Sequence, residues 1–275
     1  MTDIISNGHV NSPSDGVRQG LYTNSTVQNG PLGAKREMAD GRVFRYTYFV
    51  TAVGAGQLSA VDASVGIQTS FDAAFTNSAG TATDYSSGAE SLYVKTSDIT
   101  SDDAADVFAG GYLHITDEGG EGYTYRLRGN SAGSDSATNV MRLDLYDPTQ
   151  TAIDSEDSCS ITGNLYNNNA IYNNGTDDVI TGVPLVDQAA TSYGWLQTWG
   201  PATVLADESA GTIAAGYIAQ GSDGVNGAAQ PQGGAALNSE DAYDLFNLIR
   251  QPIIGYFMTA AVDTEYVATY LQISP

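Results

Sequence analysis

One segment of the sequence, residues 109–128, most constrains what the chain can fold into. Two runs of alternating apolar and polar residues, Ala109–Thr116 and Tyr123–Arg128, flank the glycine-rich stretch Asp117–Gly122. Alternation with a period of two is typical of strands with one buried face, and a short glycine-rich connection allows two such strands to pair. The sequence therefore predicts an antiparallel β-hairpin at these residues.

The same alternation recurs along much of the chain. Further strands are predicted over 42–50, 91–96, 140–146, 253–259 and 265–273. The composition agrees, because Gly (31 residues), Tyr (17 residues), Thr, Ser, Ala and Val are common, whereas Lys, Glu, Gln and Leu, which favour helices, are scarce. We predict an all-β protein made of β-sandwich or β-barrel modules.

A single short helix is expected near the end of the chain, over Asn238–Arg250. The segment starts with an asparagine cap, carries acidic residues in its first turn and arginine in its last, and Pro252 follows as a stop signal. We expect this helix to cover one end of a β module.

The distribution of turn residues predicts three regions. Residues 1–40 are polar and turn-rich, and they show neither strand nor helix periodicity, so they are expected to form an extended N-terminal arm. An asparagine-rich stretch, Asn164–Gly175, ends in an Asn-Gly turn and predicts a module boundary near residue 165. The expected regions are thus the arm (1–40), a first β module (41–165) and a C-terminal β module (166–275). Whether the two modules are separate barrels or one sandwich stays open.

The charge of the chain excludes some partners. The sequence holds 32 acidic and 10 basic residues, which gives a formal net charge of −22. Such a chain repels phosphate backbones and anionic lipid surfaces, so neither nucleic acid nor membrane is expected as a partner. The longest apolar runs are far shorter than the roughly 20 residues that a spanning helix needs, and no signal peptide is predicted.

The basic residues are unevenly distributed. Half of them lie within the 28 residues from Arg18 to Arg45, that is, in the arm and the strand that follows it. This asymmetry predicts an arm that lies on an acidic surface, either on its own body or on a neighbouring copy. A frayed terminus with incidental charges is the alternative.

The sequence offers few groups for catalysis. It contains one cysteine, Cys159, and two histidines, His9 and His114. A lone cysteine forms no internal disulfide, and Cys159 is expected to be a small buried side chain. His114 falls in an alternating run and is expected on a strand face. Because the common hydrolase, metalloprotease and nucleotide-binding motifs are also missing, we expect no enzyme activity and no cofactor.

Calcium binding is an alternative for two groups of acidic residues, since calcium prefers carboxylate oxygens. The groups are Asp117, Glu118 and Glu121 in the hairpin connection, and Asp102, Asp103 and Asp106 before it. Neither has the Asp-x-Asp-x-Asp-Gly spacing or a nonapeptide repeat, so no metal site is expected. A phosphate-binding loop would need a following helix, so the glycine-rich connection is predicted to be a turn.

Both tryptophans fall in one segment, Tyr193–Pro201. In a strand, Trp195, Gln197 and Trp199 would share one face. Two tryptophans on one face are typical of a core or a subunit contact, and a sugar-binding platform is the alternative.

Several motifs of the chain resemble those of head decoration (cement) proteins of tailed bacteriophages, particularly of aquatic and cyanobacterial phages. The motifs are Pro31–Gly33, Asp40–Tyr46, Gly110–Asn130, Val183-Pro184, Trp195–Ala202, Gly255–Met258 and Glu265–Ile273. The resemblance implies a virion structural protein that is made in the host cytoplasm and bound to the outer capsid surface. Its expected partners are the major capsid protein and other copies of itself, in a homotrimer.

Two sets of residues are expected to make these contacts. The arm is expected to contact neighbouring shell subunits, so that its deletion would abolish shell binding and leave the body folded. Its expected contact residues are Arg18, Leu21, Tyr22, Pro31, Leu32, Lys35 and Arg36. The core or trimer seam is expected to contain Trp195, Trp199, Tyr266 and Tyr270.

Alternatives from other classes remain open. The chain could belong to a phage tail, baseplate or fibre, or it could be an extracellular carbohydrate-binding or calcium-dependent adhesion domain, or a hydrolase. A tail protein would be present at low copy number, and a sugar binder would expose Trp195 or Trp199 beside a groove.

Overall fold

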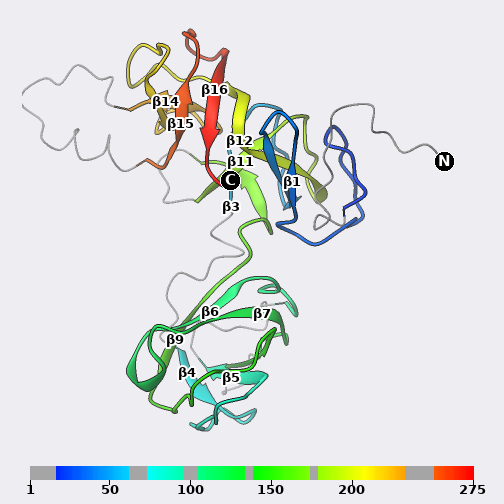
Figure 1. Cartoon of the computed structure of the whole chain (residues 1–275), viewed down its shortest axis with the longest axis vertical. Helices are drawn as coiled ribbons and strands as arrows, with labels where there is room; N and C mark the ends of the chain where they lie inside the picture. Colours follow the sequence, from blue (N-terminus) through cyan, green and yellow to red (C-terminus); the bar gives the residue numbers. More distant parts are fainter. Residues whose placement is uncertain (1–16, 62–72, 96–103, 134–138, 174–178, 233–250) are drawn as a thin grey trace, which may run out of the picture. The chain divides into compact units, whose positions relative to one another are not determined.

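A computed structural model describes residues 17–61, 73–95, 104–133, 139–173, 179–232 and 251–275 (Figure 1). The described residues form β-strands and one short 3-10 turn, so the predicted all-β class is confirmed. The helix predicted over 238–250 lies outside the described residues. Within the described part of the chain, no helix has the length and apolar character that a membrane crossing requires.

The chain divides into two compact units. Unit 1 combines residues 1–62 with residues 165–275, and unit 2 is the intervening stretch, residues 63–164. The predicted boundary near residue 165 agrees with this division. The predicted first module does not, because residues 41–61 belong with the C-terminal part of the chain and not with the residues that follow them.

Unit 2 is a closed barrel of six antiparallel strands in the order β4-β5-β8-β7-β6-β9, closed by pairing of β4 with β9 (Figure 1). The strands are β4 (Ala73–Thr76), β5 (Ser91–Lys95), β6 (Tyr112–Ile115), β7 (Thr124–Asn130), β8 (Val140–Leu145) and β9 (Ser158–Thr162). In β5, β7 and β8, every second residue points into the barrel. Phe75, Leu92, Leu127, Leu143 and Ile161 are among the side chains that fill it.

The predicted hairpin is present in unit 2. β6 and β7 pair antiparallel with Tyr112 opposite Arg126, and the 3-10 turn η1 (Glu118–Gly120) lies in the connection between them. The side chain of Asp117 accepts a hydrogen bond from the Glu118 backbone N–H at 2.9 Å and so caps this turn. Gly122 has a φ of +84°, in the left-handed region that favours glycine.

Unit 1 is a ten-stranded sheet in the order β1-β2-β10-β3-β11-β12-β16-β15-β13-β14, with an additional pairing of β2 with β12. Its first strands are β1 (Lys35–Glu37), β2 (Val43–Phe49), β3 (Ser59–Val61), β10 (Asn169–Ile171) and β11 (Ile180–Pro184). Its later strands are β12 (Ser192–Leu205), β13 (Ile218–Gly221), β14 (Ala229–Pro231), β15 (Ile253–Phe257) and β16 (Tyr266–Gln272).

The long strand β12 organises unit 1. Its first half pairs with β2, with Trp195 opposite Tyr46, and its second half pairs with β16, with Pro201 opposite Tyr270. It also pairs with β11 at Gln197. Segments from both parts of unit 1 are thereby joined to one strand. This pairing explains why β2 does not belong to the predicted first module.

Candidate assembly surfaces

The described part of the predicted arm, residues 17–40, packs on unit 1. Val17, Leu21 and Met38 are buried in one cluster with Phe44 and Tyr46 of β2 and with Trp195 of β12. Burial of a valine or leucine side chain contributes about 1.5–3 kcal/mol. Of the two surfaces on which the arm is expected to lie, its own body is therefore the one that these residues contact, and they supply part of its core.

Arg36 fixes the arm from within unit 1. It is only 6% exposed, and its guanidinium donates hydrogen bonds to the carbonyl oxygens of Gln19 (2.9 Å) and Val17 (2.6 Å). It also lies 4.2 Å from the centre of the Trp195 ring, in a cation–π contact. Trp195 Nε1 donates to the same Gln19 carbonyl at 3.1 Å. The side chains of Arg36 and Trp195 thus fix the backbone carbonyls of Val17 and Gln19 on unit 1.

Of the seven arm residues predicted to contact a shell, Leu21 and Arg36 are buried in unit 1. These two side chains cannot reach another molecule while unit 1 stays folded, so that part of the prediction is wrong. Leu32 is half-buried against the cluster that contains Val17 and Trp195. Lys35 is also half-buried, and its Nζ lies 3.6 Å from Glu37 Oε2. The remaining three, Arg18, Tyr22 and Pro31, are exposed.

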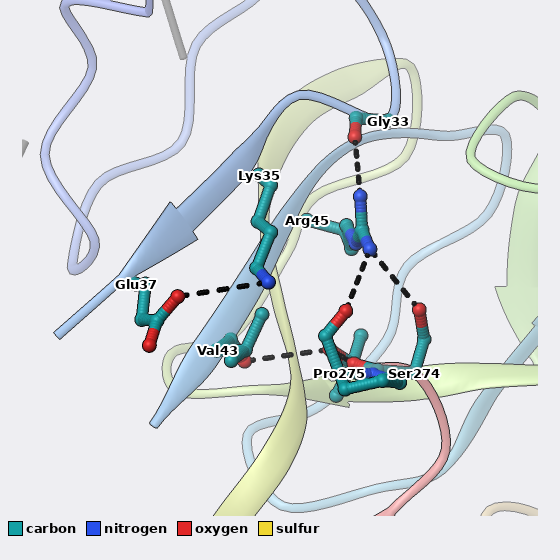
Figure 2. A network of polar contacts seen from close by, with 8 residues as sticks. Gly33, Lys35, Glu37, Val43, Arg45, Ser274 and Pro275 are labelled. Carbon is teal, nitrogen blue, oxygen red and sulfur yellow. Dashed lines mark hydrogen bonds and ion pairs between the residues drawn. The ribbon is translucent and has the colours of Figure 1, made fainter. Parts of the chain in front are cut away.

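A second polar network joins the arm to the last residues of the sequence (Figure 2). The Arg45 side chain on β2 donates to the carbonyl oxygen of Gly33 at 3.3 Å, to Ser274 Oγ at 3.3 Å and to the carbonyl oxygen of Pro275 at 3.0 Å. Thr198 Oγ1 also donates to the Ser274 carbonyl. Three segments far apart in the sequence therefore meet at β2.

The two tryptophans lie in different environments. β12 contains a bulge, because Gln197 pairs with Phe44 and Trp199 pairs with the next residue, Val43, leaving Thr198 as the extra residue. A bulge breaks the simple alternation of faces. Trp195 is fully buried, whereas Trp199 is half-buried and packs edge-on against Tyr270. The prediction that both residues share one face does not allow for this bulge.

The outward face of unit 1 carries an exposed apolar row across four neighbouring strands. Pro201 on β12 is opposite Tyr270 on β16, Tyr270 is opposite Tyr256 on β15, and Tyr256 is opposite Ile218 on β13. The rings of Tyr256 and Tyr270 stack with centroids 5.2 Å apart and an interplanar angle of 6°. Tyr256 is 38% exposed and Ile218 is 45% exposed. We call this set, together with Trp199, the aromatic row.

The strand positions around the aromatic row carry no charge. The outward positions of β16 are Tyr266, Ala268, Tyr270 and Gln272, and those paired with them on β12 are Trp199, Pro201, Thr203 and Leu205. None of these eight residues is ionisable at neutral pH, although the chain carries a net charge of −22. Three of the four predicted seam residues, Trp199, Tyr266 and Tyr270, therefore lie on an uncharged surface, whereas Trp195 lies in the core.

Tyr266 also borders a cleft on unit 1. The cleft has a volume of about 310 Å³, and its lining is mostly apolar. Its lining residues are Ala55, Gly56, Val183, Pro184, Leu185, Ala202, Thr203 and Tyr266. No charged side chain is among these lining residues, so the cleft extends the uncharged surface.

Unit 2 has a surface of the opposite kind. The outward residues of its three adjacent strands β5, β8 and β7 include four basic side chains and one acidic side chain. The basic residues are Lys95, Arg126, Arg128 and Arg142, and the acidic residue is Asp144. We call this surface the basic barrel face. The alternation of 123–128 and 140–146 could have revealed it, since Arg126, Arg128 and Arg142 occupy polar positions of predicted strands.

Two of the candidate acidic and histidine residues of the sequence analysis make structural contacts. Asp117 caps η1, and on β6 the ring nitrogens Nδ1 and Nε2 of His114 lie 3.2 Å from Thr124 Oγ1 and 2.9 Å from Thr162 Oγ1. Cys159 is fully buried in the barrel core, as predicted. Asp102 and Asp103 lie outside the described residues. Among the described residues, no three Asp, Glu, His or Cys side chains are grouped as metal ligands.

Comparison of the chain with protein-family models, with curated proteins and with solved structures returned no match.

Proposed function

We propose that this chain is a non-enzymatic virion structural protein, a cement protein that decorates the outer surface of a tailed-phage head and stabilises contacts between major capsid proteins. The motif resemblance supports the class of protein. The observation that carries the proposal is the aromatic row, because an exposed, uncharged apolar surface on a strongly acidic chain is suited to assembly.

The proposed occupant of the aromatic row is a second copy of this chain, in a homotrimer. Two copies with a charge of −22 each repel one another wherever their acidic surfaces approach. At the aromatic row, contact buries tyrosine, proline and isoleucine side chains without bringing carboxylates together. Tyrosine and tryptophan are also the residues that contribute most at protein interfaces.

A sugar-binding platform has less support. Such a platform needs aromatic ring faces that are open to solvent. Trp195 is fully buried, and the rings of Tyr256 and Tyr270 cover each other. Each of these two rings therefore has one face covered by the other, which leaves less open ring area for the stacking of a pyranose.

Size-exclusion chromatography with light scattering tests the assembly step. The wild-type chain is expected to be trimeric, and Tyr256→Glu is expected to give monomers because it places a charge in the middle of the row. Val27→Glu, which alters another exposed residue of unit 1, is the matched control and should stay trimeric. A wild-type monomer at every concentration, or a trimeric Tyr256→Glu variant, would contradict the proposal.

Quantification of the protein in purified virions tests the location. A cement protein is expected at hundreds of copies per particle, and a cryo-EM map should place it on the outer shell. A few copies per particle would assign the chain to the tail instead.

A further inference from the structure

Among the residues that the structure describes, most of the exposed basic side chains lie in unit 2 and not in the arm. Ten residues of the sequence are basic, and four of them lie on the basic barrel face. Arg36 of the arm is buried, and Lys35 lies beside Glu37. The arm, which the sequence favours as the adhesive segment, thus offers fewer accessible cations than the barrel.

The basic barrel face is interleaved with tyrosines in register. Tyr112 on β6 is opposite Arg126 on β7, and the Arg126 carbonyl accepts a hydrogen bond from the backbone N–H of Tyr146 at 3.0 Å. Arg142 on β8 is opposite Tyr93 on β5. Arginine and tyrosine therefore alternate across neighbouring strands. Tyr112 and Tyr146 are 44% and 52% exposed.

The local contacts leave this face positively charged. Arg126 lies 4.8 Å from the centre of the Tyr146 ring, a contact that retains the charge of the guanidinium. Arg142 donates to Asp144 Oδ2 at 2.9 Å, and among the described residues this is the ion pair found on the outward positions of these three strands. The face thus carries four basic side chains and one carboxylate. The outward surface of β5, β8 and β7 consequently has a net positive charge on a strongly acidic protein.

We propose that the basic barrel face docks on an acidic protein surface of the capsid shell. This inference rests on the proposed function and assigns shell attachment to unit 2, leaving the aromatic row of unit 1 for contacts between copies. Charge complementarity supports the partner's chemistry. Arginine and tyrosine are enriched at the centres of protein interfaces, where arginine pairs with carboxylates in two hydrogen bonds and tyrosine supplies apolar area.

A nucleic acid fits this face less well. Double-stranded DNA carries one negative charge per roughly 1.7 Å of its axis, so the remaining acidic surface of the chain would be repelled along the whole contact. A protein surface carries its carboxylates at isolated places. A small basic face can pair with such carboxylates while the rest of the molecule stays in solvent.

The inference is tested on the full-length chain by co-sedimentation with shells assembled from the major capsid protein of the same phage. The test variant is Arg126→Glu/Arg128→Glu, which reverses two exposed charges without removing a core side chain. The matched control is Arg18→Glu/Lys35→Glu in the arm, which changes the net charge by the same amount. The test variant is expected to lose shell affinity by roughly tenfold or more, and the control is expected to keep it.

The outcomes separate the two proposals. If wild-type protein does not bind the shells, the proposed function fails. If wild-type protein and Arg126→Glu/Arg128→Glu bind equally, or if the arm control loses affinity equally, the proposed function stands and the assignment to the barrel is overturned. Tighter binding of a thymidine oligonucleotide than of the shells, lost in Arg126→Glu/Arg128→Glu, would also overturn it. An unchanged melting temperature of both variants verifies that they are folded.

Discussion

The two units of this protein are built from the same kind of strand but by different connections. Unit 2 is a single stretch of chain, residues 63–164, whose strands close on themselves in a barrel. Unit 1 combines two separated stretches, and its core requires the arm, β2 and β12 together. All strand pairs of unit 2, including the closing pair of β4 and β9, lie within one stretch of chain, whereas unit 1 pairs β2 with β12 across the whole of unit 2 in the sequence.

The largest expected effect comes from deleting residues 1–36. This deletion removes buried Val17, Leu21 and Arg36, and each of the two apolar side chains contributes about 1.5–3 kcal/mol. Unit 1 should therefore unfold or become strongly destabilised, contrary to the expectation of a folded body. Both tryptophans lie in unit 1, so tryptophan fluorescence measures this unit alone.

Deletion of residues 1–16 is the matched control, because it keeps the buried side chains of Val17, Leu21 and Arg36. Its fluorescence transition is expected at a higher denaturant concentration than that of the longer deletion. Hydrogen exchange should meanwhile show that the barrel amides of unit 2 stay protected in both deletions. A normal fluorescence transition in the longer deletion would show that the arm is dispensable for unit 1.

The next largest effect is expected for Trp195→Ala. The side chain is fully buried, and its loss should cost about 3–5 kcal/mol of unfolding free energy. It should also release the arm, because Trp195 contacts Arg36 and donates to Gln19. The remaining Trp199 reports the denaturation of unit 1.

Phe75→Ala is the counterpart in the barrel core, with a similar cost of about 3–5 kcal/mol. It should lower the protection of barrel amides against hydrogen exchange and leave the Trp fluorescence transition in place. If either variant lowered the unfolding free energy of both units equally, the two units would unfold as one cooperative system and would not differ in the way described.

A smaller effect is expected from alkaline pH. Burial raises the pKa of Tyr46 and of Tyr193 in unit 1, and burial likewise raises the pKa of Tyr85 in unit 2. A raised pKa in the folded state means that stability is fully present below the unfolded value of about 10 and is lost as the pH rises through the folded pKa. Unit 1 holds two such groups and should lose more stability.

Denaturant titrations at about pH 8 and about pH 10.5 measure this difference. In unit 1, Tyr46→Phe should reduce the pH dependence and lower stability at both pH values, because the hydroxyl donates to Gln19 Oε1 at 2.9 Å. The same pH dependence in wild type and Tyr46→Phe would mean that Tyr46 does not titrate in this range.

The smallest effects come from two equivalent glycines. Gly41 before β2 and Gly122 before β7 have φ angles of +83° and +84°, and an added Cβ at either would meet no atom within 4 Å. Alanine should therefore cost about 1–2 kcal/mol at each site, through backbone strain alone. Equal losses would show that turns cost the same in both units. A much larger loss of unfolding free energy at Gly41 would show that unit 1 depends more strongly than unit 2 on the conformation of its turns.

Much of unit 2 could be predicted from the sequence. The residue ranges of β5, β6, β7 and β8 follow the alternation closely, and the glycine-rich connection of the β6–β7 hairpin was identified as a turn. These features depend on neighbours close in sequence. The strand residues of β2, β15 and β16 in unit 1 were also predicted, but their partners were not, because alternation carries no information about which strand lies beside another.

The candidate surfaces were predicted less well. Arg36 is predicted to contact the shell as part of the basic arm. Its guanidinium is instead buried, because two carbonyl oxygens accept its hydrogen bonds and the Trp195 ring packs on it. The bulge at Thr198 separates Trp195 from Trp199, and nothing in the local residues indicates it. Tyr266 and Tyr270 were correctly placed on one strand, although the stacking of Tyr270 on Tyr256 depends on the neighbouring strand.

The sequence by itself determined that this is an all-β chain, where several of its strands begin and end, and that a large negative charge is combined with few basic residues. These properties follow from composition and from side-chain periodicity. Only the tertiary structure decided that part of the arm belongs to a core and that most of the exposed basic residues among those described lie on the barrel. The physical reason is that burial depends on which distant segments pack together, and the sequence order leaves that choice open.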